Sequence, residues 1–153
     1  MLYTIPPSYN ALNTTMNDVR TVPLRMEAFG TDECAEHWLE LEQHIAPALD
    51  FSPDITLADV REAIFREQYH VVAVYRADEM VGAVVYKVQQ NDTAFILAIG
   101  GLWIAHANGI EQFKDFLRYF GMRRMQGIAR PSVARLWQRL GVRPIYTVME
   151  TEL

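Results

Sequence analysis

The sequence has one cysteine, no long apolar run, and no basic segment followed by an apolar stretch at its beginning. A single cysteine, Cys34, excludes an intramolecular disulfide and favours a reducing compartment. The longest nearly uninterrupted apolar run, residues 95–105, is too short to cross a bilayer, and two glycines interrupt it. Residues 1–10 do not have the pattern of a secretion signal. We therefore expect a globular protein with no membrane partner.

The composition is that of an ordinary folded domain. Of 153 residues, 50% are hydrophobic and 22% are charged, which is enough for one domain with a substantial core. The formal net charge of −5 is unevenly spread, because residues 1–70 hold most of the acidic side chains and residues 71–153 most of the basic ones. This uneven charge could steer a partner or favour contact between two copies of the chain, and it could equally reflect two solvated faces.

Residues 1–18 differ from the rest of the chain, because they are rich in Asn, Thr and Pro and have no hydrophobic period. We interpret them as an arm that docks on its own domain or on a neighbouring subunit. Residues 19–153 then form a single domain.

Hydrophobic periodicity predicts a strand over residues 19–26 and then two helices. The first helix spans residues 31–46, from a threonine N-cap to the residue before Pro47. The second begins at Thr56, and Asp59 three residues later completes a variant of the capping box.

The middle of the chain has the pattern of β-strands. Two β-branched runs, HVVAVYRA (70–77) and VGAVVYKV (81–88), flank a short polar turn and predict a hairpin. The segment TAFILAIGGLWI (93–104) predicts a third strand. Its two glycines, Gly100 and Gly101, indicate a bulge or a close approach of two backbones.

The last third alternates helices and strands. Helices are expected over residues 109–120 and 131–140, each closed by a glycine, and strands over residues 122–129 and 144–151. The order of elements is β-α-α-β-β-β-α-β-α-β. The fold class is therefore α/β (α+β mixed), with a central mixed, mostly antiparallel sheet flanked by helices.

This order resembles that of the GNAT (Gcn5-related N-acetyltransferase) superfamily over residues 19–153. Two local patterns support the resemblance: the strand 93–104 with its glycine pair, which leads into a loop and a helix, and RPSVARLWQRLGV (130–142), which is similar to a late helix and turn common in the family. The end of the chain also resembles small GNAT-like proteins encoded by tailed phages, some of which are carried in the virion.

The resemblance implies transfer of an acetyl group from acetyl-CoA to an amine. It places the pantetheine where the central strand opens, and the pyrophosphate on N–H groups at the start of the next helix, where the helix dipole favours an anion. The family's loop, which has Gln or Arg first, Gly fourth and a small residue sixth, maps onto residues 106–111. The implied cofactor-binding residues are Ile99, Gly100, Gly101, Leu102, His106, Asn108, Gly109, Ile110 and Glu111.

The loop and the catalytic acid depart from the family's pattern. His106 replaces the usual Arg or Gln, and Glu111 replaces the small residue. A carboxylate pointing into the loop at about 4 Å from a phosphate would repel it by roughly 4 kcal/mol at an effective dielectric constant of about 20. Trp137 lies where the family often has a tyrosine that protonates the leaving thiolate, and an indole N–H is not an acid at neutral pH.

The catalytic base is also missing from its expected place. The family often has a Glu on a central strand, whereas residues 93–105 contain no ionisable side chain. The catalytic candidates lie elsewhere. Glu27 and Tyr86 could lie near the cleft, and Tyr146 on the last predicted strand could supply a hydroxyl.

Two further groups of polar side chains have simple explanations. His37, Glu40 and His44 share a helical face and could hold a metal, but no fourth ligand is evident, and we predict a solvated face and no metal site. The arginines that are dense after residue 117 could contact CoA phosphates, nucleic acid or an acidic protein surface. Few aromatic residues alternate with them and the net charge is negative, which argues against nucleic acid.

Cys34 lies on an apolar stripe and is expected to be packed.

Because the loop, the acid and the base depart together, we expect a catalytically degenerate GNAT fold without a cofactor. The resemblance to phage proteins suggests a phage-encoded virion or assembly protein, found in the host cytoplasm or in the particle, that works through contacts with other protein subunits and docks its arm (1–18). The alternative is an active acetyl-CoA-dependent N-acetyltransferase that modifies a protein or a small amine. A third possibility is a module that senses CoA or acyl groups without turnover.

Overall fold

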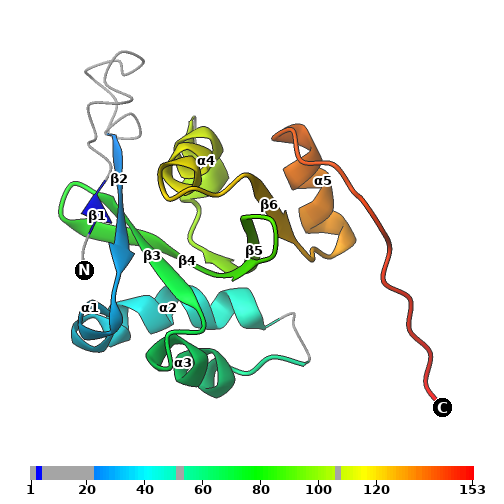
Figure 1. Ribbon diagram of the computed structural model, residues 1–153, viewed down its shortest axis with the longest axis horizontal. Coiled ribbons are helices and arrows are strands. Elements are labelled where there is room, and N and C mark those ends of the chain that lie inside the picture. Colours follow the sequence, from blue (N-terminus) through cyan, green and yellow to red (C-terminus); the bar gives the residue numbers. More distant parts are fainter. Residues whose placement is uncertain (1–2, 5–22, 51–53, 106–107) are drawn as a thin grey trace.

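The computed structural model of the chain describes residues 3–4, 23–50, 54–105 and 108–153. Its centre is a six-stranded sheet in which each strand lies beside its neighbour in the sequence, and helices cover both faces (Figure 1). No helix in these parts of the chain is long and apolar enough to span a membrane.

The sheet is antiparallel except at its last pair. The strands are β1 (Tyr3–Thr4), β2 (Leu24–Phe29), β3 (His70–Arg76), β4 (Glu79–Gln89), β5 (Thr93–Gly100) and β6 (Arg124–Gly127). The chain crosses from β5 to β6 through a helix, so that these two strands run parallel, as a helical crossover requires. The sequence-based fold class is confirmed.

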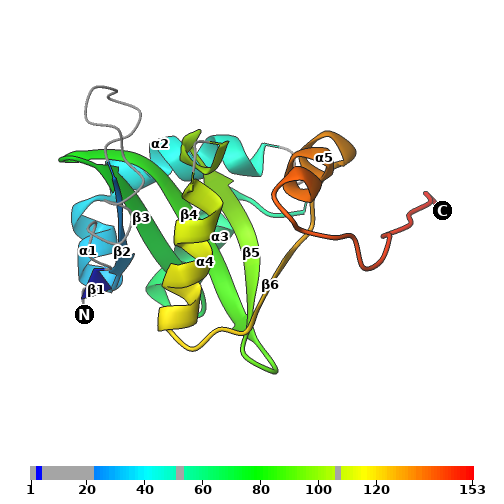
Figure 2. The same ribbon diagram turned by 90° about the horizontal axis from the view of Figure 1, so that it is seen from above.

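The helices form two layers. They are α1 (Thr31–Glu36), α2 (Trp38–Leu49), α3 (Leu57–Phe65), η3 (Trp103–Ala105, a 3-10 turn), α4 (Gly109–Tyr119) and α5 (Pro131–Arg139). Figure 2 shows α4 on one face of the sheet and α1–α3 on the other, with α5 beside β6 at the sheet's edge.

The sheet separates two apolar cores. On β3, Val72 and Val74 face the core under α4, whereas Val71 and Ala73 face the core under α1–α3. Burial on both faces explains why the central strands are nearly continuous apolar runs rather than alternating ones.

The helix predicted over residues 31–46 is two helices in the structure, so that prediction was wrong in detail. The chain turns at His37, whose ring lies 5.4 Å from that of Phe29, and this turn lets both Cys34 and Leu41 reach the core. Helix α2 also continues through Pro47, because burial of its last residue against the core outweighs the hydrogen bond that proline cannot make.

The start of the next helix and the hairpin are confirmed. The hydroxyl of Thr56 accepts a hydrogen bond from the backbone N–H of Asp59 at 3.1 Å, which is the predicted cap of α3. The two β-branched runs pair as β3 and β4, with His70 opposite Tyr86.

Strand β5 ends at Gly100, earlier than predicted. Its bulge lies at Leu97, because Val85 pairs with Ala98 while Tyr86 pairs with Ile96. The glycines serve the close approach instead. A Cβ on Gly100 would lie 1.9 Å from the carbonyl oxygen of His44.

The two ends of the sheet differ from the predictions. The first predicted strand, 19–26, is β2, which runs to Phe29 and whose predicted first residues lie outside the described residues. Of the arm, 1–18, the structure describes Tyr3–Thr4, which pair with Ala28 and Glu27 of β2. The rest of the arm lies outside the described residues.

The last predicted strand, 144–151, is not a strand in the structure. Residues 144–153 are extended and exposed, and they lead away from α5 and the sheet (Figures 1 and 2). The sequence has the β-propensity of a strand, but such propensity becomes a strand only beside a partner, and no described strand lies next to this segment.

We expect Gly100→Ala to lower the free energy of unfolding by about 2–3 kcal/mol, because its methyl group would overlap the backbone of His44. Gly127→Ala is the matched control, since a Cβ there would lie 3.4 Å from the nearest atom, an ordinary contact, and we expect a loss below about 1 kcal/mol. Urea denaturation measures both. Equal losses of unfolding free energy in the two variants would contradict the close packing of Gly100 against His44.

Candidate functional site

The segment that joins β5 to α4 is tightly built. Gly101, with φ of +95°, turns the chain out of β5, and Trp103 is then buried under α4. The Trp103 indole Nε1 donates a hydrogen bond to the carbonyl oxygen of Gly100 at 3.0 Å, and its ring meets Phe113 edge-on at 5.8 Å. The indole therefore ties the end of the strand to the helix that follows.

Helix α4 begins with a turn suited to an anion. Asn108, its N-cap, is in the left-handed conformation with φ of +67°, and its side chain makes no capping hydrogen bond. Gly109 is required because a Cβ there would lie 2.4 Å from the carbonyl oxygen of Trp103. The first N–H groups of a helix have no partner within the helix, and the helix dipole adds partial positive charge there. A helix start of this kind can bind an anion, and the resemblance predicts the pyrophosphate here.

Glu111 lies in this first turn, and its side chain points outward from the helix. Its side chain is 58% exposed, and Oε1 lies 3.0 Å from Nζ of Lys114 on the outer side of α4. The repulsion expected from an inward-pointing carboxylate therefore does not arise. The inner side of the same turn carries Ile110 and Gln112, and the Gln112 amide donates to the carbonyl oxygen of Leu24 in β2. His106, the first residue of the predicted loop, lies outside the described residues.

Strands β5 and β6 separate beside this helix start. Their ladder ends at the pair Ile96–Gly127, whereas β5 continues to Gly100. Within the part of the chain that the structure describes, residues 97–100 have no strand on their β6 side. Ile99 and Gly100 lie in this stretch and pair only with β4, and Leu102 is 81% exposed just after it. The resemblance predicts the pantetheine at an opening beside this strand, and that remains a prediction.

The structure does not bring the three catalytic candidates together. Glu27 lies opposite Ala73 on the α1–α3 face and is ion-paired with Arg25 at 2.8 Å. Tyr86 is buried on the other face, stacked with His70 at 5.1 Å, and burial raises the pKa of its hydroxyl. Tyr146 is 64% exposed in the C-terminal segment. Tyr86 thus keeps its proton at neutral pH and is not a general base there.

The other polar groups singled out in the sequence have local partners. Nδ1 of His37 lies 3.2 Å from Oε1 of Glu40, and Nε2 of His44 lies 3.1 Å from the carbonyl oxygen of Met80. No group of three or more possible metal ligands occurs among the described residues. Trp137 is half-buried against the core under α4, as expected of a packed aromatic.

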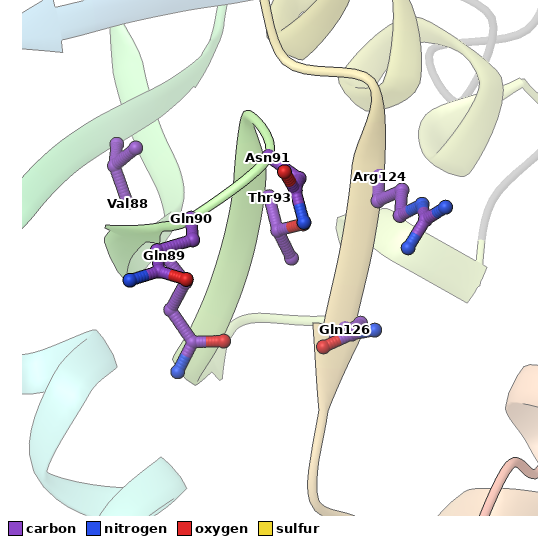
Figure 3. Close-up of a pocket in the computed structure, with 7 residues that line it drawn as sticks. All are labelled: Val88, Gln89, Gln90, Asn91, Thr93, Arg124 and Gln126. Carbon is purple, nitrogen blue, oxygen red and sulfur yellow. The ribbon is translucent and has the colours of Figure 1, made fainter.

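Sequence reasoning missed a polar pocket at the opposite end of β5 (Figure 3). It has a volume of about 600 Å³ and lies where the β4–β5 turn meets β6. Its lining residues are Val88, Gln89, Gln90, Asn91, Thr93, Arg124 and Gln126. The run of amides at 89–91 was the signal in the sequence, but only the pairing of Thr93 with Arg124 brings the two halves together.

Several solved structures with a similar fold are described as acetyltransferases. An aminoglycoside acetyltransferase from an uncultured soil metagenomic sample, in complex with trehalose, has a TM-score of 0.55 and 13% identity and covers 85% of this chain and 96% of its own. The aminoglycoside acetyltransferase AAC(6')-Iy, in complex with a bisubstrate analogue built on CoA, has a TM-score of 0.58 and 16% identity over 85% of this chain and 97% of its own. The YycN protein of Bacillus subtilis, described as a putative acetyltransferase, has a TM-score of 0.56 and 13% identity over 85% and 98%.

Neither the models of known protein families nor the sequences of curated proteins match this chain. At these identities the structural likeness shows the fold alone. The chain shares the fold of these acetyltransferases.

We expect the thiol of Cys34 to be inert in the folded protein. It is 1% exposed, and burial, with a smaller contribution from the charge of Glu33, raises its pKa to about 12. Only about one thiol in 10⁴ would then be ionised at pH 8, and the thiolate is the reactive form. An aromatic disulfide reagent should label the folded protein very slowly and the urea-unfolded protein at once. Rapid labelling of the folded protein would contradict this packing.

We expect the buried hydroxyl of Tyr86 to make stability fall in alkali. Its pKa is raised in the folded state, so its stabilising effect is complete below the unfolded pKa of about 10 and is lost as pH rises through the folded pKa. The free energy of unfolding should fall less steeply above about pH 10 in Tyr86→Phe than in the parent. Tyr119→Phe, at a residue 66% exposed, is the control and should follow the parent. If the free energy of unfolding falls with pH at the same slope in all three proteins, the buried hydroxyl of Tyr86 does not have this effect.

Proposed function

We propose that the chain binds acetyl-CoA at the start of α4 and is an acetyl-CoA-dependent N-acetyltransferase that modifies a protein or a small amine. The observation that carries the proposal is the outward ion pair of Glu111 with Lys114. That pair holds the carboxylate of the first turn of α4 on the outer side of the helix, and the side chain of Asn108 before it makes no capping hydrogen bond. The CoA-based analogue bound by AAC(6')-Iy supports the same ligand class on this fold.

The residues present fit the cofactor at two places. The helix start supplies N–H groups for a pyrophosphate, and Gly109 lets that backbone lie close to η3. The stretch 97–100 supplies backbone groups without a strand neighbour on the β6 side, which suit the amides of a pantetheine arm. Acetyl-CoA, when bound, supplies the acyl group as an activated thioester.

The protein's own contribution to catalysis would be mainly positioning. Glu27 and Tyr86 lie on opposite faces of the sheet, and Tyr86 is protonated at neutral pH. Holding two reactants in contact lowers a barrier even without a general base, because it removes the entropy cost of bringing them together. A missing acid or base typically costs about 10²–10⁴ in rate. Slow turnover on an amine that is already neutral is therefore the form of activity that this site supports.

A second candidate function is a degenerate GNAT fold that serves as a structural or assembly protein, without a cofactor. Two observations favour it: the catalytic candidates do not meet, and the segment 144–153 exposes apolar side chains that suit a protein contact. Origin in a phage, and a place in the virion or the host cytoplasm, rest on the resemblance of the chain's end to phage proteins. The arm (1–18) would then dock on other subunits.

Calorimetric titration with acetyl-CoA distinguishes the two functions. We expect micromolar binding by the parent protein and at least about tenfold weaker binding by Asn108→Asp, because the new carboxylate would cap the free N–H groups and repel the phosphates. Glu111→Gln removes a carboxylate from the outer side of the same turn, and we expect its affinity to stay within about threefold.

Desulfo-CoA, which retains the pyrophosphate, is the ligand control and should show the same ranking of variants. Absence of binding by the parent up to about millimolar ligand would reject the acetyltransferase and leave the structural role. Equal binding by Asn108→Asp and the parent would show that CoA binds elsewhere.

A further inference from the structure

The polar pocket at the β4–β5 turn lies far from the start of α4. Thr93 lines the pocket where β5 begins, whereas the same strand ends at Gly100, beside α2 and Trp103. Seven residue steps of about 3.3 Å separate the two ends of the strand by roughly 23 Å. The pocket is therefore distinct from the candidate anion site and has no part in the proposed function.

The walls of the pocket are held by backbone contacts. The carbonyl oxygen of Asp92, in the turn, accepts hydrogen bonds from the backbone N–H groups of Arg123 at 2.8 Å and Arg124 at 3.4 Å. Thr93 pairs with Gln89 in β4 and with Arg124 in β6. These contacts fix the turn against the beginning of β6. The pocket is thus formed before a ligand binds, which avoids the cost of ordering its walls.

Most of the lining groups are neutral and can both donate and accept hydrogen bonds. Side-chain amides come from Gln89, Gln90 and Asn91 at the β4–β5 turn and from Gln126 on β6 (Figure 3). Thr93, which is 4% exposed, adds a hydroxyl group. An amide offers N–H donors and a carbonyl acceptor, and a hydroxyl group is likewise both donor and acceptor. A ligand with several hydroxyl groups therefore suits this lining.

A positive charge lies among these neutral groups. Arg124 is exposed at the beginning of β6, and no carboxylate is among the described residues that line the pocket. Asp92 contributes its backbone carbonyl to the turn, and its side chain lies outside the lining. The ammonium of Lys87, 5.3 Å from the centre of the Phe95 ring, adds positive charge on the same face of the sheet. A guanidinium binds a carboxylate or a phosphate through two N–H groups, so the pocket favours a ligand that carries one such group.

We propose that this pocket binds a small hydroxylated anion, a sugar acid or a sugar phosphate, with its anionic group on Arg124 and its hydroxyl groups on the amides. The volume of about 600 Å³ lies within the range of sites for small molecules, about 300–1,000 Å³. A neutral sugar would leave the guanidinium without a charged partner, and a cation would be repelled by it. The proposal does not depend on acetyl-CoA binding at the start of α4.

NMR titration of the isotope-labelled full-length protein tests the proposal with three probes: glucuronate, glucose 6-phosphate and glucose. We expect saturable shifts for at least one anion, with a dissociation constant below about 5 mM, and binding of glucose at least about tenfold weaker. The shifts should be confined to residues 87–93 and 123–127, which surround the pocket. Comparison of the two anions distinguishes a carboxylate ligand from a phosphate ligand.

Two arginine variants test where the anionic group binds. Arg124→Gln should weaken binding of the anion at least about tenfold, because it removes the charge but keeps a side chain that forms hydrogen bonds. Arg123→Gln is the matched control, since Arg123 is exposed beside Arg124 but does not line the pocket, and we expect its affinity to stay within about threefold of the parent. Unchanged backbone amide signals away from the pocket would confirm that each variant is folded.

Three results would overturn the proposal. The first is absence of binding by both anions up to about 50 mM. The second is a set of shifts at residues 108–112 in place of the pocket, because the anion would then bind at the start of α4. The third is an equal loss of affinity in the two arginine variants, which would show general attraction to a basic surface rather than a site built around Arg124.

Discussion

The end of β5 is held between two layers, and the positions of both helix layers depend on this contact. On one face the backbone of Gly100 lies against the backbone of His44 in α2. On the other, Trp103 packs over Gly82 and donates its indole N–H to the carbonyl oxygen of Gly100. Because no side chain fits at either glycine, the start of α4 is fixed relative to α2. The candidate anion site at the start of α4 is thus tied to the core, so a substitution that shifts the packing around Gly100 would also shift that site.

Most of the fold was predictable because it follows from local patterns. The hairpin, the capping of α3 by Thr56 and the ends of α4 and α5 at glycines all came from neighbouring residues. The failures depend on contacts between distant segments. The turn at His37 and the passage of α2 through Pro47 both serve packing on the sheet. The segment 144–153 has the composition of a strand, but a strand also needs a neighbouring strand, and its own sequence cannot show whether one lies beside it.

The place of the predicted loop at the start of α4 follows from the sequence, but the direction of its side chains does not. The loop pattern located Asn108 and Gly109, and the structure places both in the first turn of α4. The Glu111 side chain points outward in the rotamer that forms the ion pair with Lys114, and the sequence allows several other rotamers. Whether Glu27 and Tyr86 share a face depends on strand register, which is set by pairing across the sheet and cannot be derived from either strand alone.

The bulge at Leu97 makes the number of residues in β5 as important as their chemistry. Before Leu97 the even-numbered Ala94 and Ile96 face α4, and after it the odd-numbered Ile99 does. One inserted residue has thus inverted the alternation halfway along the strand. Deleting Leu97 would return the strand to a uniform alternation and leave Ala98, Ile99 and Gly100 on their present faces, whereas deleting a residue outside the bulge would turn part of the strand over. A change of length by one residue therefore keeps both cores intact only at the bulge, and elsewhere in β5 it would move apolar side chains from one core to the other.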